Sequence, residues 1–551
     1  MHFNKMSIYQ IYPRSFYDSN GDGVGDLAGI TAKLDYLKEL GIDMIWITPF
    51  FLSPQRDNGY DVADYYQIDP LFGTMADFEE LLAKGKALGI EFMLDMVFNH
   101  TSTEHAWFQS ALAGDEAKQA YYIFRDGAEI PTNWLSKFGG SAWQYVSHLD
   151  KHYLHLFDVT QADLNWKNEA VRQELIKVIN YWIDKGVMGF RFDVINLIDK
   201  GDFIDDNHGD GRKYYTDGVR VNDYLTELNK LSFGKNPTMV TVGEMSSTTI
   251  EAAVGYSARL ENRLRMIFNF HHLKVDYEAG EKWSVKQFSL VELKKILFDW
   301  QLGVQAGDGW QALFWSNHDQ PRVVSRFGAS DPAYRVISAK MLANAMYLLR
   351  GTPFIYQGEE IGLPNASFMD IHQYRDVETH NYYQILREKG LVHDAVMKIL
   401  AVKSRDHGRT PMPWSGGDAH AGFSTTEPWL GLIEAYRDIN VEDALQDNNS
   451  IFYHYKELIA MRKAYSIISE GEIIPHLMEH SQLMVYERRL FPQRLLVITN
   501  FSKNNVALDL STVALEEFLF GDMLLHNYTY SVVQNSTLHL RPYESLCFAL
   551  I

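Results

Sequence analysis

Charged residues stand inside a short apolar segment near the middle of the first half of the chain. In residues 188–198, "MGFRFDVINLI", Arg191 and Asp193 are two positions apart, so a strand there directs both side chains to the same face. Such a pair is either a structural ion pair or part of a site, because ion-pair networks also form without doing chemistry. The strand alone leaves the two interpretations equally open.

Polar residues also follow three other apolar segments. They are Asp95, Asn99 and His100 in "FMLDMVFNH", Glu244 in "MVTVGE", and Asn317, His318 and Asp319 in "FWSNHD". Each alone is more often a satisfied buried polar group than a catalyst, but their recurrence at four segment ends favours a common site. The carboxylates Asp193, Glu244 and Asp319 suit a glycoside hydrolase, in which one carboxylate attacks the sugar and one protonated carboxyl serves as acid.

This chemistry assigns different protonation states to two of the carboxyl groups. We expect Asp193 to attack the anomeric carbon, with Arg191 lowering the pKa of Asp193, because a nearby cation favours the ionised form. Glu244 follows a more apolar run and lies close to other carboxylates, so we expect it to keep its proton longer and to act as acid and then base. The alternative is a buried salt-bridge network without catalysis.

The elements that must position these residues alternate along the chain. Eight short runs rich in β-branched and aromatic residues are each followed by a segment of helical periodicity. They are "SIYQIYP", "MIWITP", "FMLDMVFNH", "GFRFDVI", "MVTVGE", "RMIFNF", "ALFWSNH" and "TPFIYQG". Eight such units predict an α/β fold, a (β/α)8 TIM barrel, in which the C-terminal ends of the strands surround one mouth.

Two further regions depart from this alternation. Residues 101–166, after the third strand, are dense in Trp, Tyr, His and Gly, and we interpret them as a subdomain inserted over the barrel mouth. From about residue 468 the pattern changes to short alternating runs, which indicate an all-β C-terminal domain. The predicted organisation is a barrel of residues 1–100 and 167–467, an inserted subdomain of residues 101–166, and a C-terminal β-sandwich domain of residues 468–551.

Composition restricts the classes of partner. The 551 residues carry 51 Lys and Arg against 71 Asp and Glu, and the net charge of −20 argues against a nucleic acid or an anionic membrane as partner. The single cysteine, Cys547, excludes an internal disulfide, and no apolar run reaches the roughly 18 residues of a membrane helix. We therefore expect a cytoplasmic protein. Separately, we expect a monomer or weak homo-oligomer without an organic cofactor.

The segment "DSNGDGVGD" has the spacing of a cation-binding loop. Its candidate ligands stand at alternate positions and are Asp18, Asn20, Asp22, the carbonyl of Val24, and Asp26. Loops of this spacing wrap oxygens around Ca²⁺, although position 12 of such a loop is Gly29 here and supplies no bidentate carboxylate. We expect a structural Ca²⁺, with Mg²⁺ as the alternative ion and a metal-free Gly-rich turn as the alternative structure.

With "DMVFNH", "GFRFDVINLI", "TVGEMSSTT" and "FWSNHDQPR" in this order, the chain resembles the α-amylase family of retaining glycoside hydrolases. "IYQIYPRSF", "DNGYDVADY", "DLNWKN" and "KSRDHGRTPMPW" are similar to its oligo-1,6-glucosidase branch, whose calcium site the loop at 18–26 also matches. The resemblance implies that Asp193 is the nucleophile, Glu244 the acid/base and Asp319 the transition-state stabiliser. It assigns the glucose in subsite −1 to His100 and His318, which bind hydroxyls, to Tyr60 and Phe157, which form an apolar face, and to Asp57 with Arg409, a pair that closes the subsite.

Within this branch, "DGRKYYTDG", "FNFHHLKVDY", "GEKW" and "YRDVE" are similar to segments of trehalose-6-phosphate hydrolases. That resemblance implies a phosphorylated disaccharide substrate, split into glucose and glucose 6-phosphate. The candidate phosphate ligands are Arg212, Lys213, His271, His272, Lys274 and Lys282. Two alternatives remain at this point: an oligo-1,6-glucosidase or dextran glucosidase, with which Val194 after the nucleophile is equally compatible, and a non-catalytic binding homologue.

Overall fold

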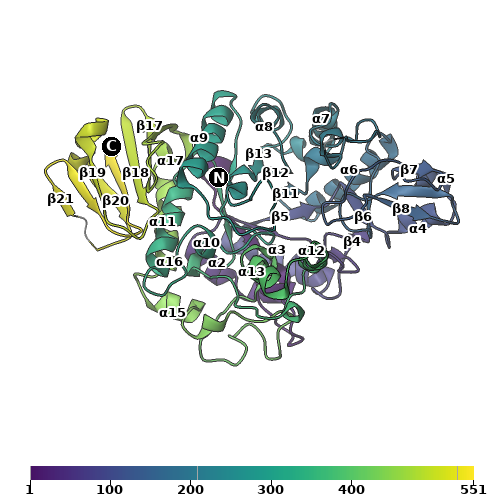
Figure 1. Cartoon of the computed structure of the whole chain (residues 1–551), viewed down its shortest axis with the longest axis horizontal. Coiled ribbons are helices and arrows are strands. Elements are labelled where there is room, and N and C mark those ends of the chain that lie inside the picture. Colours follow the sequence, from purple (N-terminus) through teal and green to yellow (C-terminus); the bar gives the residue numbers. More distant parts are fainter. Residues whose placement is uncertain (1, 208, 530–531, 551) are drawn as a thin grey trace.

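Eight parallel strands form the centre of the computed structural model, which describes residues 2–207, 209–529 and 532–550. They are β1 (Ile8–Ile11), β2 (Met44–Ile47), β5 (Glu91–Met96), β11 (Gly189–Phe192), β12 (Val240–Met245), β13 (Met266–Asn269), β14 (Ala312–Leu313) and β15 (Thr352–Tyr356). Their order is β13-β12-β11-β5-β2-β1-β15-β14, and a parallel bridge between Ile267 and Gln311 joins the two ends of this series. The structure confirms the predicted barrel, strand for strand. Figure 1 labels β5, β11, β12 and β13 side by side in the central part of the molecule.

Helices surround the barrel and bury their apolar stripes against it. The principal ones are α1 (Leu27–Ala32), α2 (Leu34–Leu40), α3 (Met75–Leu88), α6 (Glu169–Asp184), α7 (Val221–Leu231), α8 (Ile250–Ser257), α9 (Leu290–Ala306), α11 (Arg335–Tyr347) and α16 (Ile451–Ala464). The sequence fixes their ends: Thr74 forms a capping box with Asp77 at the start of α3, and Gly89 ends it with φ 74°. Asn168 caps α6, whose Leu175 and Trp182 are buried.

A segment whose apolar residues have helical spacing forms two helices. The pattern "AGITAKLDYLKELG" indicates a single helix, but Lys33 has φ −107° and ψ 10° and separates α1 from α2. The Lys33 ammonium lies over the rings of Tyr17 and Trp414, at 4.1 and 4.3 Å from their centroids. Both rings lie outside the helical segment, and Trp414 is far away in the sequence, so helical periodicity alone does not reveal the break.

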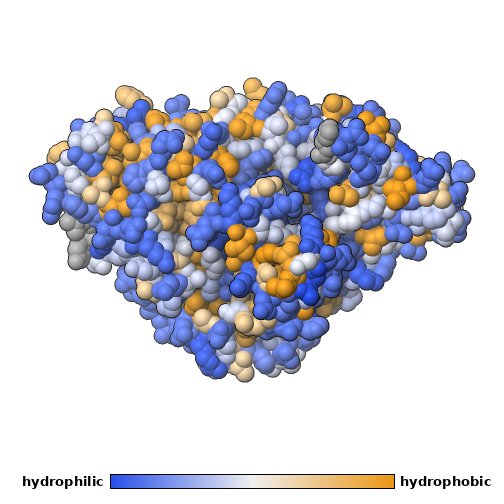
Figure 2. Space-filling model, viewed as in Figure 1, coloured by the Kyte–Doolittle hydropathy of each residue, from blue (hydrophilic) through white to orange (hydrophobic). Residues whose placement is uncertain are grey.

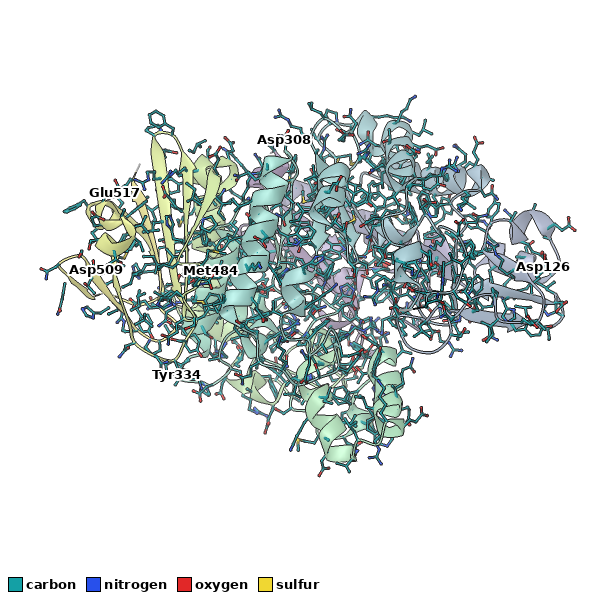
Figure 3. The ribbon with its side chains drawn as sticks, turned by 45° about the horizontal axis from the view of Figure 1, so that its top comes forward. Asp126, Asp308, Tyr334, Met484, Asp509 and Glu517 are labelled. Atoms are coloured by element: carbon teal, nitrogen blue, oxygen red, sulfur yellow. The ribbon has the colours of Figure 1, made fainter. Side chains whose placement is uncertain are left out.

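The region after β5 forms small sheets beside the barrel mouth. β6 (His100–Ser102) pairs with β10 (Gln161–Asp163), and β9 (Lys151–Leu154) lies between β7 (Phe124–Asp126) and β8 (Trp143–Val146). Figure 3 places Asp126 of β7 at the outer end of the molecule. Trp134 and Trp143 belong to a separate apolar cluster that also contains Val194, directly after β11. This cluster ties the insertion to the barrel mouth; its limits at residues 101 and 166 stay a prediction.

Two antiparallel sheets follow the barrel. One has the order β16 (Glu472–His476), β17 (Leu483–Leu490), β18 (Gln493–Asn500), β23 (Ser545–Leu550) and β20 (Asp522–His526); the other has β19 (Val506–Asp509), β22 (Thr537–Leu540) and β21 (Val532–Gln534). They enclose their own apolar cluster, in agreement with the expected all-β end. The first strand begins a few residues later than residue 468, because α17 (Ser466–Glu470) buries Ile467 and Ile468 first. Asp509 and Glu517 mark this end, opposite Asp126 (Figure 3).

The surface mixes residue types. On the face seen in Figure 2, hydrophilic residues surround hydrophobic groups of limited size. Among the described residues, no helix combines the length and the apolar character needed to cross a membrane.

Candidate active site

The three carboxylates singled out in the sequence meet at one cavity of about 200 Å³ at the C-terminal ends of the strands. Asp193 directly follows β11, Glu244 lies in β12, and Asp319 lies in the loop after β14. The cavity is lined by Asp57, Tyr60, His100, Phe138, Phe157, Gln161, Asp193, Val194, Glu244, Ser246, Ser247, Phe270, Lys274, Lys282, Asp319, Gln320, Glu378 and Arg405. The convergence expected from the barrel geometry is therefore present.

Arg191 connects the carboxylates beneath the cavity. Its Nη1 donates to Asp95 Oδ1 and to Asp193 Oδ1, both at 2.6 Å, and its Nη2 donates to Glu244. The Arg191 side chain is 1% exposed, and the cavity lining does not include it. The charged strand is therefore both a structural ion pair and part of a site, because the buried ion pairs of Arg191 hold two carboxylates, Asp193 and Glu244, that face the cavity.

Burial separates the protonation states of these carboxyl groups. Burial raises the pKa of Asp193 to about 6, although Arg191 opposes the rise, so the net shift is upward and not downward as expected from the sequence. Burial, together with the carboxylates of Asp193 and Asp319, raises the pKa of Glu244 to about 8 against the opposing charge of Arg191. Near neutral pH Asp193 is ionised and Glu244 is protonated, which are the states that a nucleophile and an acid require.

Asp319 shows the opposite shift. Burial alone would raise its pKa, but the guanidinium groups of Arg405 and Arg409 hold the pKa of this carboxyl well below its usual range. Arg409 Nη2 lies 2.8 Å and Arg405 Nη1 3.1 Å from Asp319 Oδ1. Asp319 therefore stays ionised and provides a fixed negative charge at the cavity wall.

The backbone after Asp193 turns sharply. Val194 has φ 35° and ψ 40°, a left-handed conformation that a β-branched residue rarely adopts. Val194 N donates to Glu244 Oε2 at 3.4 Å, and the Val194 side chain lines the cavity. Such conformations concentrate at functional sites, where the surrounding structure stabilises them.

The rings of Tyr60, His100 and Phe157 line the cavity, whereas His318 packs against Tyr60 and is not among the lining residues. The Tyr60 ring stacks on His318, with centroids 5.1 Å apart, and the Tyr60 hydroxyl donates to Asp95 at 2.9 Å. The Phe157 ring lies 5.2 Å from His100. Burial lowers the pKa of His100 to about 4 and that of His318 to about 3, so both imidazoles are neutral and suited to hydrogen bonds with hydroxyl groups.

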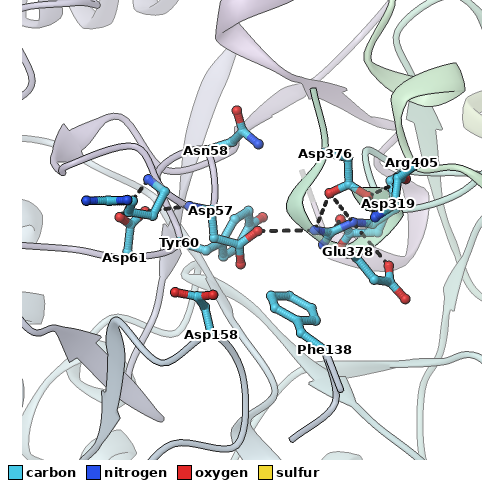
Figure 4. A network of polar contacts seen from close by, with 12 residues as sticks. Asp57, Asn58, Tyr60, Asp61, Phe138, Asp158, Asp319, Asp376, Glu378 and Arg405 are labelled. Atoms are coloured by element: carbon cyan, nitrogen blue, oxygen red, sulfur yellow. Dashed lines mark hydrogen bonds and ion pairs between the residues drawn. The ribbon is translucent and has the colours of Figure 1, made fainter. Parts of the chain in front are cut away.

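Asp57 pairs with a different arginine from the one expected. Arg405 Nη2 lies 3.2 Å from Asp57 Oδ1, whereas Arg409 bonds to Asp319 and to Asp376, the latter at 3.4 Å. Figure 4 shows Arg405 between Asp57 on one side and Asp376 and Glu378 on the other. Arg405 precedes α14 (Asp406–Arg409), and Arg409 is its last residue. Residues four positions apart in a helix lie on the same face, so this spacing could have predicted that both arginines face the site.

Two further residues beside Asp57 and Arg405, Gln161 and Phe138, could not be predicted from the sequence. Gln161 Nε2 donates to Asp57 Oδ2 at 3.1 Å, and the Phe138 ring lies 5.0 Å from the Arg405 guanidinium. Both residues come from the inserted region, which therefore supplies part of the cavity wall. Isolated amide and aromatic side chains carry no spacing signal by which sequence reasoning could select them.

The six candidate phosphate ligands separate into three groups. Lys274 and Lys282 line the cavity, and the Lys282 ammonium is paired with Glu378 at 2.6 Å. Arg212 and Lys213 are largely exposed and paired with Asp210 and Asp206, each at 2.8 Å.

The two histidines among these candidates are placed away from the cavity lining. His271 stacks on Trp300 with centroids 4.7 Å apart, and His272 Nε2 lies 3.0 Å from Phe314 O. Burial lowers the pKa of His271 to about 4 and that of His272 to about 3. Neutral imidazoles do not supply the charges for which these two residues were selected.

The loop at residues 18–26 is a series of turns held by its own carboxylates. Asp18 accepts N–H hydrogen bonds from Asn20, Gly21 and Gly23, and Asp22 accepts one from Val24. Asp26 caps α1 by accepting from Gly29 N. Each Asp18 oxygen already accepts two hydrogen bonds, because Ser424 Oγ also donates to Oδ2 at 2.6 Å. Asp22 and Asp26 keep lone pairs that they can offer to a cation. Within the described ranges, no three His, Cys, Asp or Glu side chains gather as metal ligands, so the metal stays a prediction.

Comparison with known proteins agrees with this geometry. The family model "Alpha amylase, catalytic domain" matches residues 10–471, and "Alpha-amylase SusG C-terminal domain" matches residues 483–547. The chain is 49% identical to trehalose-6-phosphate hydrolase of Bacillus subtilis, covering 100% of this chain and 98% of that protein, and 45% identical to oligo-1,6-glucosidase of Bacillus cereus, covering 98% of each. The crystal structure of Bacillus licheniformis trehalose-6-phosphate hydrolase superposes with a TM-score of 0.94 at 48% identity, covering 99% of both chains.

Proposed function

Because the chain belongs to the α-amylase family of glycoside hydrolases, we propose that it hydrolyses trehalose 6-phosphate to glucose and glucose 6-phosphate with retention of configuration. The observation that carries this proposal is the position of Lys274, which lines the same cavity as the ionised Asp193 and the protonated Glu244. Two relatives named trehalose-6-phosphate hydrolase are 49% and 50% identical over nearly the whole chain, which supports trehalose 6-phosphate as the substrate.

The reaction proceeds by two displacements. A carboxylate oxygen of Asp193 attacks the anomeric carbon, and the bond from that carbon to the bridging oxygen breaks as Glu244 donates its proton to the bridging oxygen. Glucose 6-phosphate leaves, and glucose stays bound as an ester of Asp193. Glu244, now ionised, takes a proton from the attacking water, and the ester bond breaks to release α-glucose. Asp319 stabilises the positive charge that develops on the sugar in both steps.

The region of the cavity lined by Tyr60, His100 and Phe157 is proposed to hold the glucose of subsite −1. Tyr60 and Phe157 supply its apolar face, and the neutral imidazoles of His100 and His318 bind its hydroxyls. Asp57, held by Arg405, closes the pocket, while Arg409 holds Asp319 in place. A closed subsite −1 releases one glucose in each cleavage.

The oligo-1,6-glucosidase function is the second candidate, favoured by the 45% identical Bacillus cereus relative. Val194 fits either function. The test is a comparison of kcat/KM for trehalose 6-phosphate, trehalose, isomaltose and maltose. We expect trehalose 6-phosphate to be the best substrate. If kcat/KM is higher for isomaltose, the protein is an oligo-1,6-glucosidase instead. The non-catalytic alternative is set aside, because all three carboxylates line the cavity.

The pKa values of the two carboxyl groups give an expected pH profile. With isomaltose, whose sugar leaving group needs a proton and which has no phosphate of its own to titrate, kcat/KM should fall below about pH 6 as Asp193 becomes protonated. It should also fall above about pH 8 as Glu244 loses its proton. Initial rates from pH 4 to pH 10 measure both limbs, and a profile that stays level over this range contradicts the two assignments.

We also propose that Asp18, Asn20, Asp22, Asp26 and the carbonyl of Val24 bind one structural Ca²⁺, with Mg²⁺ as the alternative. Dialysis against EDTA should lower Tm by several degrees while activity at low temperature changes little, because an ion that binds only the folded state stabilises it. Asp22→Asn should lower Tm similarly and make it insensitive to EDTA. If neither Tm nor metal content changes after EDTA treatment, the loop binds no metal and is an ordinary turn.

The remaining properties are proposals that composition supports. A cytoplasmic location agrees with the buried, unpaired Cys547. The net charge of −20 supports the absence of nucleic-acid and membrane partners. A monomer or weak homo-oligomer stays the expected state.

A further inference from the structure

Two lysine ammonium groups that bond to serines of the cavity wall have no carboxylate partner: Lys274 lines the cavity itself, and Lys137 lies outside its lining. Lys137 Nζ donates to Ser246 Oγ at 3.3 Å, and Lys274 Nζ donates to Ser247 Oγ at 3.1 Å. In the part of the chain that the structure describes, neither ammonium forms an ion pair. Lys282 differs, because Glu378 already neutralises its charge.

The two lysines reach this place from different parts of the fold. Lys274 ends η6 (His271–Lys274), directly after β13, whereas Lys137 belongs to the inserted region between β7 and β8. The backbone N–H of Lys137 donates to Leu156 O at 2.8 Å, and Ser136 Oγ donates to Phe157 O at 2.7 Å. These bonds fix the Lys137 backbone beside Phe157, which lines the cavity.

The surroundings of both ammonium groups disfavour their charge in the free protein. Burial, and then Arg212, lowers the pKa of Lys137 to about 7; Lys274 acts in the same direction, and Asp210 and Glu244 act in the opposite one. Burial, and then Arg212, lowers the pKa of Lys274 to about 8. Clustered, half-buried cations cost free energy unless an anion joins them. In a protein of net charge −20, such a cluster indicates an anionic ligand.

The two serines place that ligand on the leaving-group side. Ser246 and Ser247 follow Glu244 by two and three residues and line the cavity, so a group that they contact lies next to the acid. The closed end, with Asp57 and Arg405, belongs to the other sugar. An anion at the serines is therefore part of the glucosyl unit that accepts the proton of Glu244.

We propose that Lys137 and Lys274, together with the hydroxyls of Ser246 and Ser247, bind the phosphate of the leaving group, and that Lys137 is a specificity-determining residue supplied by the inserted subdomain. The proposal rests on the proposed function and deepens it, since it names which cations select a phosphorylated sugar. Ammonium and hydroxyl donors together suit the three oxygens of a phosphate monoester. Of the six cations selected from the sequence, only Lys274 belongs to this set.

The test compares Lys137→Gln with the wild-type enzyme on trehalose 6-phosphate and trehalose. We expect kcat/KM for trehalose 6-phosphate to fall at least tenfold, and that for trehalose to change by less than about threefold. Lys137→Arg should recover part of the preference. Lys151→Gln is the matched control, because Lys151 lies in β9 of the same region and its ammonium pairs with Asp126 at 3.3 Å. It should leave both values unchanged.

Binding of glucose 6-phosphate, measured by calorimetry, gives a readout independent of turnover. Its Kd should rise at least tenfold in Lys137→Gln, while the Kd of glucose changes little. If the wild-type enzyme prefers trehalose 6-phosphate but Lys137→Gln keeps that preference and the same Kd, the inference is wrong and the proposed function stands. If the wild-type enzyme shows no preference for the phosphorylated sugar, the proposed function itself is wrong.

Discussion

Replacement of Asp193 by Asn is expected to reduce kcat by at least about 10⁴-fold, because an amide oxygen does not form the ester intermediate on which the double displacement depends. The substitution keeps the size of the side chain and can keep an acceptor for the Arg191 hydrogen bond, now 2.6 Å long. Single-turnover measurements with trehalose 6-phosphate should show neither glucose 6-phosphate release nor a covalent intermediate by mass spectrometry.

A matched substitution separates chemistry from folding. Asp199 is also buried and lies six positions further along the same segment, where its Oδ2 accepts from Arg220 N at 3.0 Å. Asp199→Asn makes the same chemical change outside the cavity lining and should retain activity within about tenfold at a similar Tm. If Asp193→Asn keeps a tenth of the wild-type activity, Asp193 is not the nucleophile.

Replacement of Glu244 by Gln should have the second-largest effect, and its size should depend on the leaving group. For trehalose 6-phosphate the poor leaving group needs a proton, so kcat/KM should fall by about 10²- to 10⁴-fold. For 4-nitrophenyl α-glucoside the leaving group departs without one, so formation of the glycosyl enzyme should be far less impaired. The burst of 4-nitrophenol in stopped-flow experiments measures that step directly.

The same variant should accumulate the glycosyl enzyme, because Glu244 is also the base for the second displacement. Azide, an anionic nucleophile that needs no base, should restore turnover of the aryl glucoside by Glu244→Gln and leave Asp193→Asn unaffected. Equal losses in the first step for both substrates, without an azide effect, would remove Glu244 from the acid/base role.

The fold followed from the sequence because its strongest signals are local. All eight strands were predicted from short β-branched and aromatic runs, and the polar residues that end them meet at one mouth because parallel strands of a barrel share their direction. Asp193, Glu244 and Asp319 were selected in this way, and the structure places them in one cavity. A repeating local pattern combined with one geometric rule was sufficient for this part of the site.

What the sequence left out depends on contacts between distant segments. Arg405 bonds to Asp57 across 348 positions of sequence, and no spacing rule relates the two residues. Lys137 contacts Ser246 from the inserted region, where no helical or strand periodicity predicts which way its side chain points. His271 was selected for its charge, which burial removes by lowering its pKa to about 4. Burial and long-range pairing are properties of the folded chain, so composition and periodicity do not report them.

Internal competition between trehalose 6-phosphate and trehalose in one reaction tests the central claim most directly, since the ratio of the two consumption rates at equal concentration is the ratio of their kcat/KM values. A charge-assisted hydrogen bond contributes about 1.5 to 3 kcal/mol, so two such contacts to phosphate predict a ratio of at least about 100 in favour of trehalose 6-phosphate. The products should be glucose and glucose 6-phosphate in equal amounts. A ratio near one would contradict the account.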